Sequence, residues 1–288
     1  MKVATLGRAT RRSGPQTSLR GELVAQLVRK DLKVKYQGST LGFMWSLANP
    51  LLTLVVYTFV FTVVFPSRVP KFGFFLMSGL LIWNFFSLGV SGAATSILGN
   101  AGLVKKVPFP HSALPLAAIG FAGVQVVLQY VVLIIALSVG GMAPLRPELL
   151  LLVPATFVAL VFTVGLGMFV AATTVRLRDT QHILEVALFA WLYVTPIIYQ
   201  VSLVHDRFGG GLVEKLYYLN PMTGVVISFQ RALYGQVYYP GTDKLLLASA
   251  DDLFYLKALA VGFVVSAVVF LVGRWQFRRL SADFAEEL

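Results

Sequence analysis

The sequence predicts an all-α integral membrane protein with six transmembrane helices. Of its 288 residues, 57% are hydrophobic and 13% are charged, whereas a soluble domain usually carries about 25% charged residues. The mean hydropathy is +0.77. Six apolar windows approach or exceed the roughly 20 helical residues that cross a bilayer core. Backbone groups in lipid must be hydrogen-bonded within their own segment, which favours helices.

The first 18 residues are predicted to be a flexible tail. They contain arginines without an apolar stretch directly behind them, which is not the pattern of a signal peptide. Residues 19–37 are predicted to form an amphipathic helix on the cytoplasmic leaflet. Leu23, Leu27 and Leu32 recur on one side of this helix, and the lysines fall mostly on the other. A helix packed on a soluble partner is the alternative interpretation.

The six predicted spans follow the apolar windows in order. They are residues 41–65, 72–98, 113–140, 149–174, 183–199 and 253–272. An even number of spans puts both termini on one side of the membrane. The segments on that side carry about twice as many Lys and Arg residues as the opposite segments. We therefore expect both termini, including the tail 273–288, to be cytoplasmic.

Four residues inside the predicted spans indicate a helix bend, close helix packing or a polar site. Pro50 removes a hydrogen bond and bends the first span, either to expose backbone to a cavity or as a packing kink. Gly165 and Gly167 in the fourth span allow a neighbouring helix to approach closely. Glu185 is the only acid within a span. It lies about one turn inside the fifth, where we interpret it as a snorkelling structural acid.

The outer segment 200–252 is predicted to contain a re-entrant helical hairpin. Residues 212–218 and 221–234 are apolar enough to dip into the bilayer. Asn220 provides an N-cap for the second helix, and Pro221 suits its first position. Non-helical backbone at membrane depth must be buried by protein or line a water-filled path, so we expect the hairpin to do one or the other.

Several classes of chemistry are excluded by what the sequence lacks. It has no cysteine for disulfides, thiolate metal sites or nucleophilic catalysis. It has no Gly-x-x-x-x-Gly-Lys-Ser/Thr loop, and its three histidines are not at metal-ligand spacing. The net charge of +11 fits membrane topology better than nucleic-acid binding. We expect no enzymatic site, metal or cofactor here, and active transport would need energy from another polypeptide.

Five segments form a recognisable series along the chain. They are residues 28–51 with VRKDLKVKY and NPL, 103–110 with LVKKVPFP, 178–199 with RD and TPIIY, 219–223 with LNPMT, and 277–287 with FRR and FAEE. This series resembles the ABC-2 permease family, in the branch that exports O-antigen-type polysaccharide and teichoic acid. The resemblance covers nearly the whole chain after the tail and implies that residues 41–272 form an ABC-2 transmembrane domain.

The resemblance implies an exporter in the bacterial inner (cytoplasmic) membrane. A homodimer of this chain would bind two copies of a separate ABC ATPase, which would carry ATP and Mg. The substrate would be an undecaprenyl-linked polysaccharide or a teichoic acid, moved from the cytoplasm to the outer face of the membrane. This chain itself would bind no cofactor.

Three groups of site residues follow from the same resemblance. The residues expected to contact the ATPase are Arg29, Lys30, Asp31, Lys105, Lys106, Val107, Phe109, Arg178 and Asp179. The aromatic residues expected to stack on sugars along the path are Trp45, Tyr57, Trp83, Phe86, Trp191 and Tyr193. The outer-gate candidates are Tyr199, Asn220 and Pro221.

Three other functions stay open on the sequence. An ABC-2 exporter of a small drug or lipid would share this architecture. A membrane-embedded glycosyltransferase or lipid-modifying enzyme needs catalytic acids near a membrane face, for which Glu185 is the candidate. A passive channel would need no ATPase, so the substitutions Lys106→Ala and Phe109→Ala would leave its flux unchanged.

Overall fold

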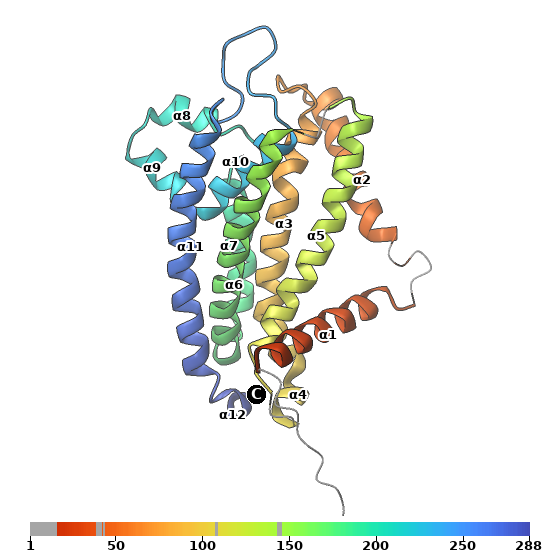
Figure 1. The fold of residues 1–288 in the computed structure, drawn as a ribbon, viewed down its shortest axis with the longest axis vertical. Helices are drawn as coiled ribbons and strands as arrows, with labels where there is room; N and C mark the ends of the chain where they lie inside the picture. Colours follow the sequence, from red (N-terminus) through yellow and green to blue (C-terminus); the bar gives the residue numbers. More distant parts are fainter. Residues whose placement is uncertain (1–15, 39–41, 43, 107–108, 143–145) are drawn as a thin grey trace, which may run out of the picture.

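The structure is a computed structural model that describes residues 16–38, 42, 44–106, 109–142 and 146–288. Within these residues every regular element is a helix, apart from an isolated bridge between Tyr238 and Leu245. Long helices run side by side as a bundle (Figure 1). The short helix α8 (Ser202–Phe208) lies at one end and α4 (Ala101–Lys106) at the other. We call these the α8 end and the α4 end.

Five of the described helical segments are long and apolar enough to cross a membrane. They are α2 (Met44–Phe59) with the π-helical turn Val60–Val64, α3 (Phe72–Ser96), α5 (Ala113–Val139), α6 (Leu152–Arg176) with its 3-10 start Pro147–Leu151, and α11 (Asp252–Leu280). They coincide with the first four predicted spans and the sixth.

The fifth predicted span, 183–199, corresponds to a shorter helix. α7 (Thr180–Val194) has 15 residues, or about 22 Å at 1.5 Å per residue, against a bilayer core of about 30 Å. It ends shortly before Pro196, because proline disfavours helical backbone in the residue before it. α7 packs beside α3 and α6, and its role as a sixth span stays a prediction.

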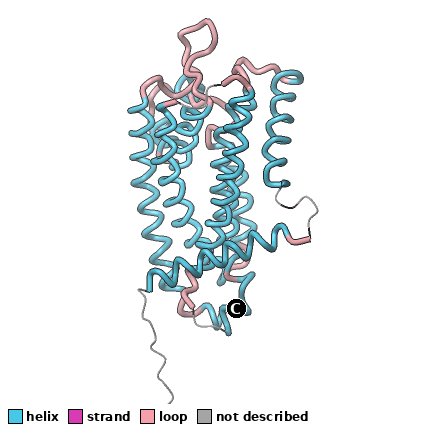
Figure 2. Tube along the Cα trace, turned by 45° about the vertical axis from the view of Figure 1, so that its right-hand side comes forward, coloured by secondary structure: helices cyan, strands magenta, loops and turns pink. Residues whose placement is uncertain are grey.

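α3 is the central helix of the bundle. Most of its residues are buried, and it contacts α2, α5, α6, α7 and α10 (Pro221–Leu233). Its sequence is apolar nearly all round, as is typical of a helix enclosed by others. By contrast, α2 stands at the edge of the bundle (Figure 2), where much of its surface is exposed.

α6 and α11 form the most extensive helix pair of the bundle. A Cβ atom at Gly165 would lie 2.5 Å from the Cα of Phe270, and a Cβ at Gly273 would overlap the carbonyl oxygen of Gly165. Only glycine fits such close backbone contact. The prediction that Gly165 allows close helix approach is therefore confirmed.

α1 (Gln16–Tyr36) lies across the α4 end of the bundle and packs on α5 (Figure 1). Its Leu27 is buried, and Lys35 donates a hydrogen bond to the side chain of Gln125 in α5. A helix is thus present where the amphipathic helix is expected at 19–37, with part of its apolar side covered by protein. Its place on the cytoplasmic leaflet stays a prediction. Residues 16–18 of the predicted tail are helical and belong to α1, and residues 1–15 lie outside the described residues.

Short helices form a layer at the α8 end. α9 (Leu212–Tyr218) and α10 match the two predicted helices of the outer hairpin, whereas α8 is an additional element. α10 is buried along its whole length, against α3, α6 and α11. The re-entrant position of this hairpin in a bilayer stays a prediction.

The C-terminal tail predicted at 273–288 is largely helical. α11 continues past residue 272 to Leu280, since arginine is a good helix former and cations suit the end of a helix. α11 is followed by α12 (Phe284–Glu287), which lies at the α4 end (Figure 1). The 3-10 turn Leu98–Asn100, which precedes α4, lies at the same end. α12 contacts α4 and α6.

Candidate functional site

The α4 end carries basic side chains that are free of the bundle core. Lys105 and Lys106 in the last turn of α4 are exposed, while Val104 is buried beneath them. Arg178 and Asp179 are exposed in the turn between α6 and α7. Val107 lies outside the described residues.

α1 contributes three more of the predicted ATPase contacts to this end, which are Arg29, Lys30 and Asp31. Arg29 and Lys30 are exposed. The ammonium of Lys30 lies 3.6 Å from the carboxylate of Asp31 and 3.5 Å from the side-chain oxygen of Asn100. Because Asn100 directly precedes α4, this contact brings the two predicted groups together. We call Arg29, Lys30, Lys105 and Lys106 the basic surface.

The C-terminal segment ties this end of the bundle together. Arg176, the last residue of α6, donates hydrogen bonds to Asp283 at 2.8 Å and to Glu287 at 2.7 Å. Phe284 is fully buried and packs edge-on against Phe277, with ring centroids 5.5 Å apart. These partners are far apart in sequence, so no local pattern predicts the arrangement.

Phe109, one of the predicted ATPase contacts, is half-buried. It packs edge-on against His111 with ring centroids 5.4 Å apart, and His111 lies 6.0 Å from Phe284. The ring is apolar and adjoins the buried cluster of the α4 end, so part of its surface is removed from water. His111 therefore links the segment before α5 to α12, and Phe109 packs against His111.

Three of the predicted path residues meet inside the bundle. Trp83 and Phe86 of α3 are 2% and 0% exposed. Trp191 of α7 packs edge-on against both, with centroid distances of 6.5 and 5.5 Å. Phe162 of α6 lies 5.3 Å from Phe86 and 5.7 Å from Trp191. In a single chain this cluster joins α3, α6 and α7.

The other three path candidates lie at or near the surface. Trp45 is 48% exposed and Tyr193 is 55% exposed, while Tyr57 is half-buried. They belong to α2 and α7, which expose apolar faces as α5, α6 and α11 also do. These faces comprise Leu52, Val55, Val56 and Phe59 in α2, and Ile183, Val186, Phe189 and Val194 in α7. Contiguous apolar patches of this kind mark lipid or protein contact.

The outer-gate candidate Tyr199 connects the end of α7 to α9. Its hydroxyl lies 3.0 Å from the hydroxyl of Tyr217 and donates to the carbonyl of Val194 at 3.1 Å. Burial raises the pKa of the Tyr217 hydroxyl well above its ordinary value. Tyr217 therefore stays protonated at neutral pH and can act as the donor to Tyr199.

Asn220 joins α10 to the same point. Its side-chain oxygen accepts from the backbone N–H of Met222 at 3.1 Å, which confirms the predicted N-cap, and Pro221 occupies the first helical turn. Its amide donates to Thr195 at 3.2 Å. Tyr199 and Asn220 thus both fasten the short helices to the end of α7.

A buried charge network at the α8 end has no counterpart in the sequence predictions. The side chain of Arg231 in α10 is 9% exposed and contacts Glu148 at 3.1 Å and Asp252 at 2.9 Å. Asp251 caps α11 by accepting a hydrogen bond from the N–H of Leu253. Asp252 pairs with Arg231 because the fold brings α10 beside the start of α11.

Comparison with known proteins gives a consistent result. The sequence profile of the ABC-2 type transporter family matches residues 22–234. The chain is 34% identical over 236 residues to the O-antigen export system permease protein RfbA of Myxococcus xanthus, covering 82% of this chain and 89% of that protein. It is 28% identical over 271 residues to an O-antigen export system permease protein RfbA of Klebsiella pneumoniae, covering 93% of this chain and 95% of that protein.

Proposed function

The chain belongs to the ABC-2 type transporter family, and we propose that it is the permease subunit of an exporter for a polysaccharide of O-antigen type. The observation that carries this proposal is similarity to O-antigen export permeases over 93% of this chain and 95% of its relative. The substrate would be carried on a lipid such as undecaprenyl phosphate. A teichoic acid, which is a polyol-phosphate polymer linked to a lipid in the same way, is the related alternative.

The energy for export would come from a separate ABC ATPase that binds ATP and Mg. The sequence offers no nucleotide loop of its own. Two ATPase copies would dock at the α4 end, on the basic surface together with Phe109, Arg178 and Asp179. The exposed lysines of α4 support this docking site, because charged rim residues speed and orient association.

The transport path would form between two copies of the chain. The exposed apolar faces of α2 and α7 support this arrangement, since a two-fold axis beside them would bury both faces. Trp45, Tyr57 and Tyr193 would then border the path. The cluster of Trp83, Phe86 and Trp191 would hold α7 against α3. A displacement of α7 would separate these side chains and expose them to the path.

The chain would sit in the inner membrane with the α4 end and both termini in the cytoplasm. The distribution of Lys and Arg along the sequence supports this orientation. The outer hairpin would then lie at the exit, where Tyr199, Asn220 and Pro221 would hold the short helices across the path.

Depleting the chain in its native cells tests the proposal. We expect lipid-linked glycan to accumulate inside the cell while mature glycan at the surface falls, and the accumulated species identifies the substrate. If neither pool changes while a small molecule or lipid accumulates, the chain is an exporter of that compound and the polysaccharide assignment is wrong.

A further inference from the structure

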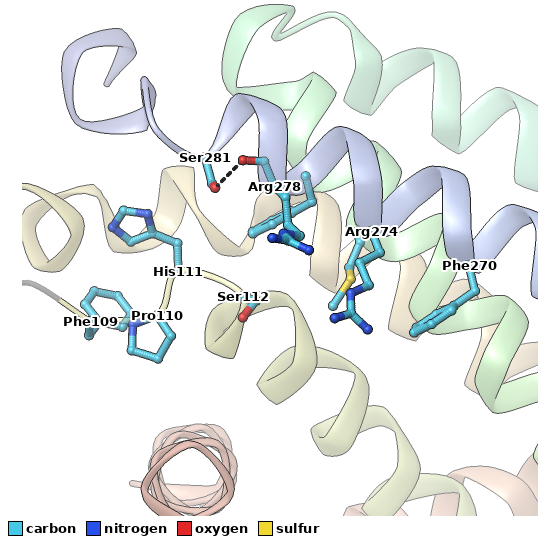
Figure 3. A pocket seen from close by; sticks show the side chains of 10 residues that line it. Phe109, Pro110, His111, Ser112, Phe270, Arg274, Arg278 and Ser281 are labelled. Carbon is cyan, nitrogen blue, oxygen red and sulfur yellow. Dashed lines mark hydrogen bonds between the residues drawn. The ribbon is translucent and has the colours of Figure 1, made fainter. Parts of the chain in front are cut away.

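A cavity of about 650 Å³ opens at the α4 end, between the last turns of α11 and the segment that leads into α5 (Figure 3). Its lining combines two arginines, Arg274 and Arg278, with the apolar side chains of Met168, Phe270 and Phe277. Phe109 also lines this cavity and is one of the proposed ATPase contacts, whereas neither arginine has a role in the function proposed above.

The cavity is positively charged. Figure 3 shows Arg274 and Arg278 extending from one face of α11 toward the same space. Its lining contains no Asp or Glu. Of the acids in the C-terminal segment, Asp283 and Glu287 are paired with Arg176, and Glu286 is exposed. Within the described residues the two guanidinium groups form no salt bridge.

Both arginines are exposed to water, which weakens the repulsion between them without removing it. Like charges four residues apart on a helix repel each other, and guanidinium groups keep their charge at physiological pH. Ser281 donates its hydroxyl to the carbonyl of Arg278 at 3.2 Å, so it offers oxygen lone pairs rather than a proton to the cavity. An anion between the guanidinium groups would relieve the repulsion.

The surroundings of the arginines are those of a membrane boundary. A second groove of about 470 Å³ on the same helix end is bordered by the same two arginines together with Arg279, Leu271 and Trp275. Leu271 is 64% exposed and Trp275 is 60% exposed. An exposed apolar helix face that ends in tryptophan and arginine is typical of the level of the lipid headgroups.

We propose that Arg274 and Arg278 bind the phosphate group of a membrane lipid, whose hydrocarbon chain lies along the exposed apolar face of α11. The planar guanidinium group donates two parallel hydrogen bonds to a phosphate, and two such groups four residues apart can enclose it. The lipid is either a resident anionic phospholipid or the polyprenyl phosphate end of a lipid-linked substrate. The binding itself does not depend on the identity of the exported glycan.

Native mass spectrometry of the purified full-length protein tests the site. Phosphatidylglycerol, phosphatidylcholine and undecaprenyl phosphate are added separately as probes. We expect the two anionic lipids, or one of them, to bind more strongly than phosphatidylcholine. The double substitution Arg274→Gln/Arg278→Gln should weaken that binding at least about tenfold, because charge-assisted hydrogen bonds are lost from both sides of the phosphate.

Arg178→Gln is the matched control. Arg178 is also an exposed arginine of the α4 end, but it lines neither the cavity nor the second groove. We expect less than a twofold change for this variant. An equal loss in both variants would show a general basic surface and overturn the proposal, as would equal binding of all three lipids to the unmodified protein.

Competition separates the possible sources of the phosphate. If undecaprenyl phosphate displaces phosphatidylglycerol, the site accepts the lipid end of a polyprenyl-linked substrate. If phosphatidylglycerol alone binds, the site holds a resident phospholipid. If millimolar inorganic phosphate removes all bound lipid, the cavity is a site for free phosphate and the assignment to a lipid is wrong.

Discussion

The guanidinium of Arg231 in α10 lies 3.1 Å from the carboxylate of Glu148. Glu148 is 83 positions earlier in the chain and lies in the 3-10 turn that leads into α6. The same guanidinium donates to Asp252 at the beginning of α11. One buried cation therefore joins three segments at the α8 end. Such a network matters because removing one member leaves the others desolvated and unpaired.

The substitution Arg231→Met should lower the free energy of unfolding by about 2 kcal/mol. Breaking a fully buried pair costs about 3–5 kcal/mol, and here Glu148 and Asp252 keep 22% and 45% of their side-chain surface exposed. Thermal unfolding in detergent measures the loss. The double variant Arg231→Met/Glu148→Gln should recover part of it, and strict additivity of the two substitutions would rule out the pairing as the cause.

The substitution Gly273→Ala should cost at least about 2 kcal/mol of stability, because the added methyl group overlaps the backbone of α6 and cannot be relieved by a side-chain rotation. The yield of folded protein and its thermal unfolding report the effect. Gly123→Ala in α5 is the control, since its Cβ would meet only Phe85 at 3.8 Å. Similar losses in both variants would contradict the close packing of α6 on α11.

The substitution Lys106→Ala should weaken ATPase docking about fivefold and lower export, because an exposed lysine at a charged rim contributes on the order of 1 kcal/mol. Binding of the purified ATPase and the amount of surface glycan are the measurements. Lys215→Ala removes an equally exposed lysine at the α8 end and should change neither. Unchanged export in Lys106→Ala together with full ATPase-independent flux would favour the passive channel.

Single cysteines can map the proposed contact between two copies, because the chain contains none of its own. We expect Val186→Cys on the exposed face of α7 to form a cross-linked dimer under oxidation, since a two-fold axis near α7 brings the two positions together. Val264→Cys on the exposed face of α11 is the control and should stay monomeric. The opposite pattern on a denaturing gel would move the interface from α7 to α11.

Much of this architecture could be predicted from local patterns. Apolar windows located five long helical segments, and Asn220 with Pro221 marked the start of α10, because capping and proline preference act within a few residues. Gly165 predicted a close helix contact because glycine has no Cβ atom to keep a neighbouring helix away.

The remaining features depend on partners that the sequence does not place side by side. The pairing of Arg231 with Glu148, and of Arg176 with Glu287, joins residues far apart in the chain. The packing of Phe109 against His111, and of His111 against Phe284, also depends on the fold, which brings the C-terminal segment beside this loop. Likewise, the early end of α7 near Pro196 shortens a window that hydrophobicity alone extends to residue 199.

The glycine contact between α6 and α11 has a mechanical consequence. The backbones of α6 and α11 touch at Gly165 and Gly273, and the two helices pack extensively along each other. Sliding or tilting one past the other would break many contacts at once, so we expect α6 and α11 to move as one rigid body. A conformational change that opens a passage is thus expected at the helices that pack less extensively on the bundle. α2 at the edge of the bundle and the short helix α7 are therefore the elements whose displacement against the rigid pair would widen or close a passage.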